Sequence, residues 1–497
     1  MSVLVGLDIG TTGARALAIT PEGRVIAQAT ASYPLLLPRP GWAEQHPADW
    51  WAAAKTVLRA VAQMVEDRII GLGLTGQMHG AVFLDERDEV IRPAILWNDQ
   101  RTAAQCAEIE QRVGSQQLRE IAGNPALTGF QAPKILWVRE HEPENYRRIR
   151  HVLLPKDYIR LQLTGTVATD ASDAAGTLLL DLRQRDWSPT ILEALAIPRE
   201  WLPQVYEGPM VTGHVRAAIA AELGLPAGIV VAAGGGDNAA AAVGTGIITP
   251  GRMSASIGTS GVLFVHSDEL VLDPTGRVHV FCHAVPGAYH LMAVTLSAGG
   301  SLRWWRDVLT ATDYTVLADE AAAVPPGAEG LLFLPYLTGE RTPHRDPLAR
   351  GAFIGLTARH GRAHLTRAVM EGVVFSLRDG LECLRDCGVE VREVRATGGG
   401  ARHPLWLQLL ADIFNQPIYR MAIDEGPAYG AALLAGVAAG VYRDLTDASQ
   451  YIRVEPTIVY PDPSRVARYN GIYQLYCRLY PALRDIFWQL SASDSLN

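Results

Sequence analysis

Lysine is scarce in this chain of 497 residues, which contains only Lys55, Lys134 and Lys156. None of them follows a glycine, so the sequence has no Gly-Lys-Ser/Thr loop of the kind that holds nucleotide phosphates in P-loop proteins. The formal net charge of −8, from 44 Lys and Arg against 52 Asp and Glu, argues against a general nucleic-acid binder. Any phosphate chemistry in this chain must use another architecture.

Cysteine is sparse too, with five scattered residues. Only Cys383 and Cys387 lie close together, and with no second pair or neighbouring histidine a buried helix face is favoured over a metal site. This usage predicts a reduced, cytoplasmic protein. We expect no signal peptide, because the N-terminus lacks a basic segment. We expect no membrane span, because the uncharged stretch 428–442 is short and broken by glycine.

The composition is that of a globular protein, with 48% apolar and 19% charged residues. Length alone predicts about three domains. However, residues 9–13 read Ile-Gly-Thr-Thr-Gly and residues 257–261 read Ile-Gly-Thr-Ser-Gly, and each pentapeptide joins two expected strands. This repeat predicts two related α/β domains, over residues 1–244 and 245–497, with C-terminal helices that could pack on either one.

Hydrophobic periodicity and turn residues predict the elements on which the motifs lie. The expected strands are residues 3–9, 14–20, 24–32, 67–74, 91–96, 252–257 and 262–266, and the expected helices are residues 47–64, 364–383, 403–415 and 426–440.

The two repeated turns are candidate phosphate sites. Successive backbone N–H groups in such a turn form a concavity that binds anions, although a single turn of this kind is more often a plain hairpin connection. Two turns in matching positions of the two halves indicate two anion-binding loops that face each other across a polyphosphate. Their residues are Thr11, Thr12 and Gly13 in the first half and Gly258, Thr259 and Ser260 in the second.

Two aspartates lie at candidate catalytic positions. Asp8 ends a strand beside the first turn, where a carboxylate suits Mg²⁺ held mostly through water; the alternative is a structural bond to a loop. Asp237 follows three glycines and precedes an alanine-rich helix. The residues alone support helix capping and general-base catalysis equally at Asp237.

Further candidates lie at strand ends. Residues 398–401 follow a strand and open a helix, which suits a nucleotide resting on the helix N-terminus or, alternatively, a tight turn. The Gly-x-Gly-x-x-Gly pattern at residues 71–76 is followed by Gln77, Met78 and His79 rather than by a helix, so we expect no dinucleotide site there. Trp97 could line a polyol pocket or belong to the core.

Together these elements resemble the FGGY family of carbohydrate kinases over nearly the whole chain. Residues 129–137 and 351–371 are similar to two family signatures, although Gln131 stands where the family usually has a small Pro, Ser or Thr. The resemblance implies two actin-like (ribonuclease H-like) domains with mixed sheets, ATP between them, Asp237 as catalytic base and Asp8 linked to Mg²⁺. It also implies phosphate binding at both turns and adenosine binding at Gly398, Gly399, Gly400, Ala401 and Asn415.

The segments 77–80, 96–99, 154–158, 172–177 and 339–344 are similar to those of the branch that phosphorylates D-xylulose. The resemblance therefore implies ATP-dependent phosphorylation of D-xylulose at its 5-hydroxyl. Another ketose or a pentitol, such as ribulose or arabinitol, and a non-catalytic actin-like ATP-binding module are the alternatives, and a homodimer is left open. The sugar-binding residues implied by the resemblance are Gln77, Met78, His79, Trp97, Asp237 and Asn238.

Overall fold

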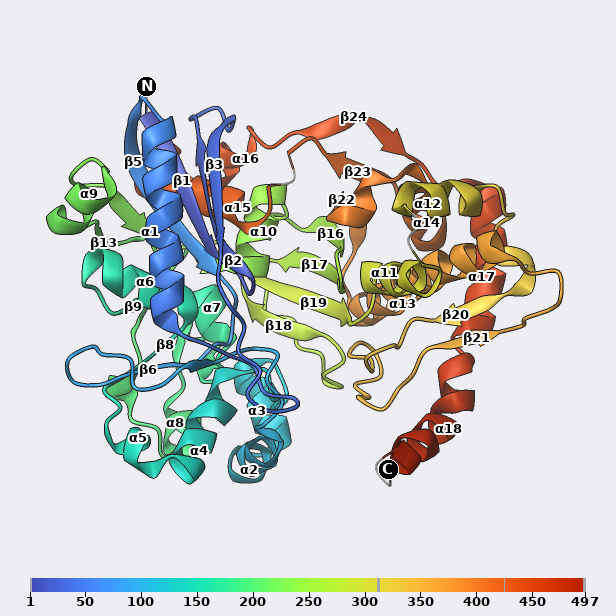
Figure 1. Cartoon of the computed structure of the whole chain (residues 1–497), viewed down its shortest axis with the longest axis horizontal. Helices are drawn as coiled ribbons and strands as arrows, with labels where there is room; N and C mark the ends of the chain where they lie inside the picture. Colours follow the sequence, from blue (N-terminus) through green and yellow to red (C-terminus); the bar gives the residue numbers. More distant parts are fainter. Residues whose placement is uncertain (1, 311–312, 424, 495–497) are drawn as a thin grey trace.

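The computed structural model of the chain describes residues 2–310, 313–423 and 425–494, which form two α/β bodies side by side (Figure 1). The sheet of the first body has the order β13-β14-β5-β1-β2-β3, with β15 also paired to β5. Strand β1 runs antiparallel to β2 and parallel to β5, so the sheet is mixed, as expected. The strands are β1 (Ser2–Ile9), β2 (Gly13–Ile19), β3 (Val25–Ser32), β5 (Arg68–Gly76), β13 (Val211–His214), β14 (Val230–Ala232) and β15 (Gly235–Gly236).

The sheet of the second body repeats this pattern, with the order β18-β19-β17-β16-β22-β23-β24. Strand β16 runs antiparallel to β17 and parallel to β22, as β1 does with β2 and β5. The relationship predicted from the repeated pentapeptide is therefore confirmed for the strands around both turns. The strands are β16 (Gly251–Ile257), β17 (Gly261–Ser267), β18 (His279–Cys282), β19 (Tyr289–Thr295), β22 (Val391–Thr397), β23 (Ile418–Met421) and β24 (Val454–Val459).

Helices cover both faces of the first sheet. Helix α1 (Pro47–Met64) begins at its proline, as predicted, and packs on β2 and β3. Helices α10 (Asp237–Thr245) and α15 (Pro427–Ala438) pack against each other, and α15 lies against β1 and β5 (Figure 1). The approach is so close that a β-carbon at Gly73 of β5 would lie 1.8 Å from the carbonyl oxygen of Ala431. A helix from the last part of the chain therefore completes the first body.

The last helices lie on the second body instead. Helix α17 (Pro463–Tyr476) packs on α14 (Pro404–Phe414), and the Tyr469 hydroxyl donates to the Glu371 carboxylate of α13 (Arg362–Asp386) at 2.7 Å. The strand expected over residues 91–96 is reduced to β7 (Ala94–Ile95), because Pro93 supplies no N–H to a ladder. Within the described ranges, no helix combines the length and apolarity needed to cross a bilayer.

Candidate functional site

Two carboxylates meet at the carboxyl ends of the central strands of the first sheet. Asp8, near the end of β1, is paired with Thr75 of β5. Gly235 of β15 is paired with the same Thr75, and Asp237 follows β15 directly. The parallel pairing of three short segments thus brings together two aspartates that are far apart in the sequence. Burial raises the pKa of Asp8 to about 7, and the negative charge of Asp237 adds to this rise.

Asp8 has one carboxylate oxygen, the buried Oδ1, that accepts no hydrogen bond from the described residues. Arg15, across the β1–β2 pair, lowers the pKa of Asp8 only in part, because its guanidinium is bonded to Glu425 and to Gln28. A buried carboxylate oxygen without a donor is suited to a hard divalent cation, which prefers oxygen ligands and retains water in its shell. The residues at this edge therefore fit Mg²⁺.

Asp237 is the first residue of α10, and its carboxylate does not cap the helix, whose N-cap is Gly236. Oδ1 accepts hydrogen bonds from the backbone N of Asn238 at 2.7 Å and from its Nδ2 at 2.9 Å. Oδ2 accepts none from the part of the chain that the structure describes. Burial raises the pKa of Asp237 to about 6, and the two bonds from Asn238 limit the rise. One oxygen is thus oriented by the protein while the other is available to a ligand.

A cavity of about 660 Å³ lies in the second body, a size typical of small-molecule and cofactor sites. Its walls include Gly258 and Thr259 of the repeated turn, Gly399 and Gly400 after β22, and the N-terminal end of α14. Helices α11 (Gly299–Val308) and α12 (Tyr314–Ala322) complete it. The glycine-rich turns and a helix N-terminus give this cavity the donors that a nucleotide needs.

Some predicted nucleotide residues lie outside this cavity wall. Ser260, Gly398 and Ala401 adjoin lining residues but do not line the cavity themselves. Asn415 is the C-cap of α14, about 16 Å along the helix from the end that lines the cavity. The structure does not bring Asn415 to the cavity. Sequence reasoning missed Gly299 and Gly300, although a Gly-Gly pair opening a helix after a strand is a detectable signal.

The two repeated turns are held in different ways. In the first, Gln45 Nε2 donates to the Thr11 carbonyl at 2.7 Å and Trp97 Nε1 donates to the Thr11 hydroxyl at 3.0 Å, while Thr12 is exposed and Gly13 begins β2. In the second, Gly299 N donates to the Gly258 carbonyl at 2.8 Å and Gly300 N to the Thr259 carbonyl at 3.0 Å. Trp97 is 40% exposed, which excludes the core interpretation of this residue.

A second, small cavity of about 40 Å³ lies between the two bodies. His79 lines it in a neutral form, because burial lowers its pKa to about 3. Its Nδ1 lies 2.6 Å from the Gly176 carbonyl oxygen, which can only accept a hydrogen bond. Nδ1 therefore carries the proton, and Nε2 is free to accept a hydrogen bond from a ligand. The remaining lining residues are Trp97, Leu127, Gly129 and Phe130 from the first body and His279, Phe281, Met292 and Arg341 from the second.

The other predicted sugar residues link this cavity to the aspartates. Met78 packs so closely on Gly236 that a β-carbon there would lie 2.9 Å from its sulfur. Gln77 is buried and donates through Nε2 to Gln45 at 2.9 Å, and its Oε1 has no partner among the described residues. Gln131, the residue that departs from the family pattern, donates to the Gly80 carbonyl at 2.9 Å and so supports the loop that carries His79.

Arg341 is a cavity residue that sequence reasoning did not single out. Its guanidinium makes no hydrogen bond or ion pair with any described residue, and burial lowers its pKa. Arg341 is only partly buried, so its guanidinium is free to donate to the acceptors of a ligand in the cavity. The segment 339–344, noted for its resemblance, was the only signal for this residue.

Comparison with known proteins identifies the family. The N-terminal domain model of the FGGY family of carbohydrate kinases matches residues 3–244, and the C-terminal domain model matches residues 253–439. The chain is 44% identical over 482 residues to the xylulose kinase of Escherichia coli, covering 96% of this chain and 99% of that one.

Two solved structures from Lactobacillus acidophilus also match. The ligand-bound xylulose kinase has a TM-score of 0.94 at 28% identity, with 99% of this chain and 100% of that one covered. The gluconate kinase has a TM-score of 0.94 at 29% identity, with 98% and 99% covered. The predicted fold class, two actin-like domains with mixed sheets, is confirmed. The chain belongs to the FGGY family of carbohydrate kinases.

Proposed function

We propose that the protein transfers the γ-phosphoryl group of ATP to the 5-hydroxyl of D-xylulose, giving D-xylulose 5-phosphate and ADP. One observation carries the proposal: Asp237 keeps one free carboxylate oxygen, and its neighbour Gly236 packs on Met78 beside the His79 cavity. A base is thus linked through Gly236 and Met78 to a pocket that offers His79 and Arg341 to a ligand, in a chain similar to several xylulose kinases.

The nucleotide would lie in the 660 Å³ cavity, with its phosphates directed toward the two turns. Exposed Thr12 and Thr259 offer hydroxyl donors there, and the turn backbones offer N–H groups. Asp8, with its unpartnered Oδ1, would hold Mg²⁺ mainly through water; the ion neutralises charge on the phosphate oxygens when bound. Much of the catalysis then comes from positioning and charge stabilisation.

Asp237 accepts the proton of the sugar hydroxyl at Oδ2 as the phosphoryl group is transferred. With a pKa of about 6, this carboxylate is ionised at neutral pH yet more basic than an ordinary aspartate. Because Asn238 holds Oδ1 with two donors, the carboxylate plane is set before the substrate arrives. His79 Nε2 accepts a hydrogen bond from a second sugar hydroxyl, and Arg341 donates to sugar oxygens from the other body.

The sugar pocket must open to admit its ligand. A volume of about 40 Å³ holds only about three water molecules, which is far less than a pentose requires. Because its walls come from both bodies, separation of the bodies would open it and their return would enclose the sugar. Closure excludes water from the reacting phosphate.

We also place the enzyme in the cytoplasm, since its five cysteines are free thiols.

The test is an ADP-release assay with D-xylulose, D-ribulose, D-arabinitol and gluconate. Gluconate is included because a gluconate kinase shares this fold and Arg341 offers a cation to a carboxylate. The proposal expects kcat/KM for D-xylulose to exceed the others by at least about tenfold, with the phosphate at O5 by NMR. A higher kcat/KM for another sugar would overturn the substrate assignment. Nucleotide binding without any phosphorylated sugar would instead support a non-catalytic module.

A further inference from the structure

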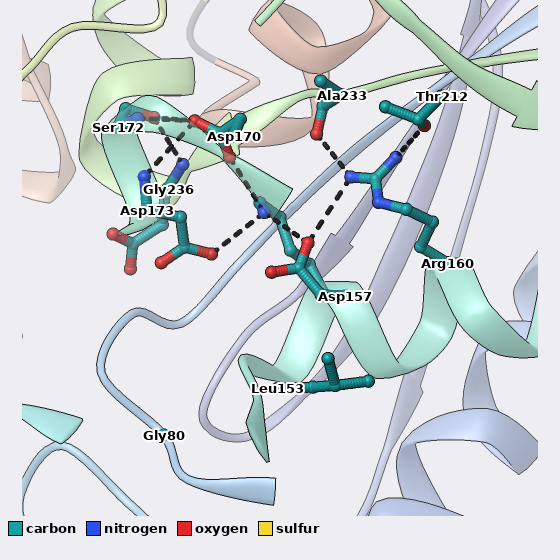
Figure 2. A network of polar contacts seen from close by, with 12 residues as sticks. Gly80, Leu153, Asp157, Arg160, Asp170, Ser172, Asp173, Thr212, Ala233 and Gly236 are labelled. Atoms are coloured by element: carbon teal, nitrogen blue, oxygen red, sulfur yellow. Dashed lines mark hydrogen bonds and ion pairs between the residues drawn. The ribbon is translucent and has the colours of Figure 1, made fainter. Parts of the chain in front are cut away.

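A buried ionic cluster lies close to Gly236, the residue that precedes Asp237 (Figure 2). Lys156, near the start of α6 (Pro155–Thr164), is surrounded by three carboxylates, and none of these side chains is exposed to solvent. Its Nζ lies 2.7 Å from Asp157 Oδ1, 2.8 Å from Asp170 Oδ1 and 3.2 Å from Asp173 Oδ2. Ion pairs of this kind lose much of their Coulombic gain to desolvation, so fold stability alone is a weak reason for the cluster.

The cluster contains a second cation, Arg160, whose Nη2 lies 3.5 Å from Asp157 Oδ1. Lys156 and Arg160 face three aspartates, and burial together with the neighbouring carboxylates holds the pKa of Asp173 well above its ordinary value. The Arg160 guanidinium also donates to the carbonyl of Ala232 at 2.8 Å, at the end of β14 and just before the three glycines that lead to Asp237.

A chain of hydrogen bonds connects the cluster to the Asp237 segment (Figure 2). Asp170 Oδ2 accepts from the backbone N of Ser172 at 2.8 Å and from the Ser172 hydroxyl. The same hydroxyl accepts from the backbone N of Gly236 at 3.1 Å. Because Ser172 donates its only hydroxyl proton to Asp170, its lone pairs are turned toward Gly236. The residue before Asp237 is thus bonded to a side chain that the cluster orients.

The other end of the same short helix, α7 (Ala171–Ala175), holds His79. The carbonyl of Gly176, the C-cap of α7, accepts from His79 Nδ1 at 2.6 Å. A β-carbon at Gly176 would lie 2.8 Å from this nitrogen and 2.8 Å from Met78 Cε, so a larger residue would displace these side chains. His79 itself has a left-handed backbone, with φ of 70°, which is uncommon for a residue other than glycine. One five-residue helix therefore contacts both the sugar side and the base side of the site.

We propose that α7, anchored by Lys156 and Asp170, is a positioning element that sets the distance between His79 and Asp237, with Ser172 as the positioning residue for Asp237. This inference rests on the proposed roles of His79 and Asp237. A sugar held by His79 must present its hydroxyl to Asp237 within hydrogen-bond reach, and a misplacement of about 1 Å can cost on the order of 10² in rate. A rigid, desolvated anchor supplies that precision.

The test is Ser172→Ala, with Ser188→Ala as the matched control. Ser188 is equally buried in the first body and its hydroxyl also accepts from a backbone N–H, that of Ile191 at 3.3 Å, away from both cavities. We expect Ser172→Ala to lower kcat about 10- to 100-fold, with KM for ATP changed less than about twofold. The control should lose similar thermal stability and keep its kcat. A Ser172→Ala enzyme with wild-type kcat, or a loss matched by the control, overturns the proposal.

A double mutant separates positioning from general loosening. If Ser172 acts through Asp237, adding Ser172→Ala to Asp237→Ala causes no further loss of kcat; two losses that multiply would contradict this. A fully active Asp237→Ala enzyme would refute the base assignment, whereas the comparison of the two serine variants tests the positioning role separately.

If Ser172→Ala does not fold, Asp170→Asn replaces it. One acceptor oxygen then remains for Ser172, but the bond to Lys156 is weakened. We expect the same direction of kcat change, and an unchanged kcat would overturn the proposal.

Discussion

Replacing Asp237 by asparagine tests the proposed mechanism most directly. Asparagine has nearly the same volume and keeps an acceptor oxygen for the two donors of Asn238, so the segment should retain its structure. What the variant loses is the basic oxygen. General-base catalysis contributes ~10²–10⁴-fold in rate. At 1.36 kcal/mol per factor of ten, this corresponds to a barrier increase of about 3–5 kcal/mol.

The pH dependence supplies an independent signature of the same base. Asp237 acts only when ionised and its pKa in the free protein is about 6, so kcat/KM of the wild type for D-xylulose should level off above about pH 7 and fall as the pH decreases, to about a tenth at pH 5. Saturating Mg²⁺ is kept in both enzymes so that the carboxylate of Asp8, whose pKa is also raised, stays ionised. In Asp237→Asn the remaining activity should lose this acidic limb.

The assay is ADP release at saturating ATP from pH 5 to pH 8, with D-xylulose varied to give both kcat and kcat/KM and with folding checked by thermal melting. Asp181→Asn is the control, since Asp181 also accepts a backbone N–H, from Arg183 at 2.9 Å, but lies in neither cavity wall. Near-wild-type kcat in Asp237→Asn, or an unchanged acidic limb in that variant, would refute the assignment of Asp237 as the base.

Three further predictions concern the metal, the sugar and the stability of the second body. Chelation of Mg²⁺ should abolish turnover, and Asp8→Asn should raise the Mg²⁺ concentration needed for half-maximal rate; an unaltered Mg²⁺ titration contradicts the role of Asp8. Arg341→Met should raise KM for the sugar about 10- to 100-fold through the loss of charged hydrogen bonds, with KM for ATP unchanged in initial-rate measurements; equal changes in both would argue against a sugar contact. Burial raises the pKa of Asp379 to about 7 in the folded protein. Between about pH 4 and 7 the folded state therefore retains a proton that the unfolded state loses, and the free energy of unfolding falls by up to about 1.4 kcal/mol per pH unit. Asp379→Asn keeps an acceptor for the Tyr473 hydroxyl and should be stabilised, relative to the wild type, more at pH 8 than at pH 5 in urea unfolding; an equal difference at both pH values would exclude this linkage.

The elements and turns around the site were predictable because they depend on residues close in the chain. Pro47 at the start of α1, the alternating strands and the glycine turns each act through local backbone preferences. The repeated pentapeptide also predicted the domain organisation. Two similar local structures in a chain of this length indicated two bodies with equivalent strand pairings. The three glycines before Asp237 likewise indicated a local turn that exposes its carboxylate at the start of a helix.

Other features were decided only by tertiary packing. No local pattern shows that α15 completes the first body, because its fit depends on the close approach of its backbone to Gly73. The joining of Arg341 to the His79 cavity depends on how the two bodies meet, and the hydrogen bond from Gly236 to Ser172 depends on where α7 lies. Burial also moves the pKa of Asp8 and Asp237 into the range useful for catalysis, and the desolvation responsible exists only in the folded chain. The sequence by itself determined the chemical groups and their local geometry, whereas the distances between those groups required the packed structure.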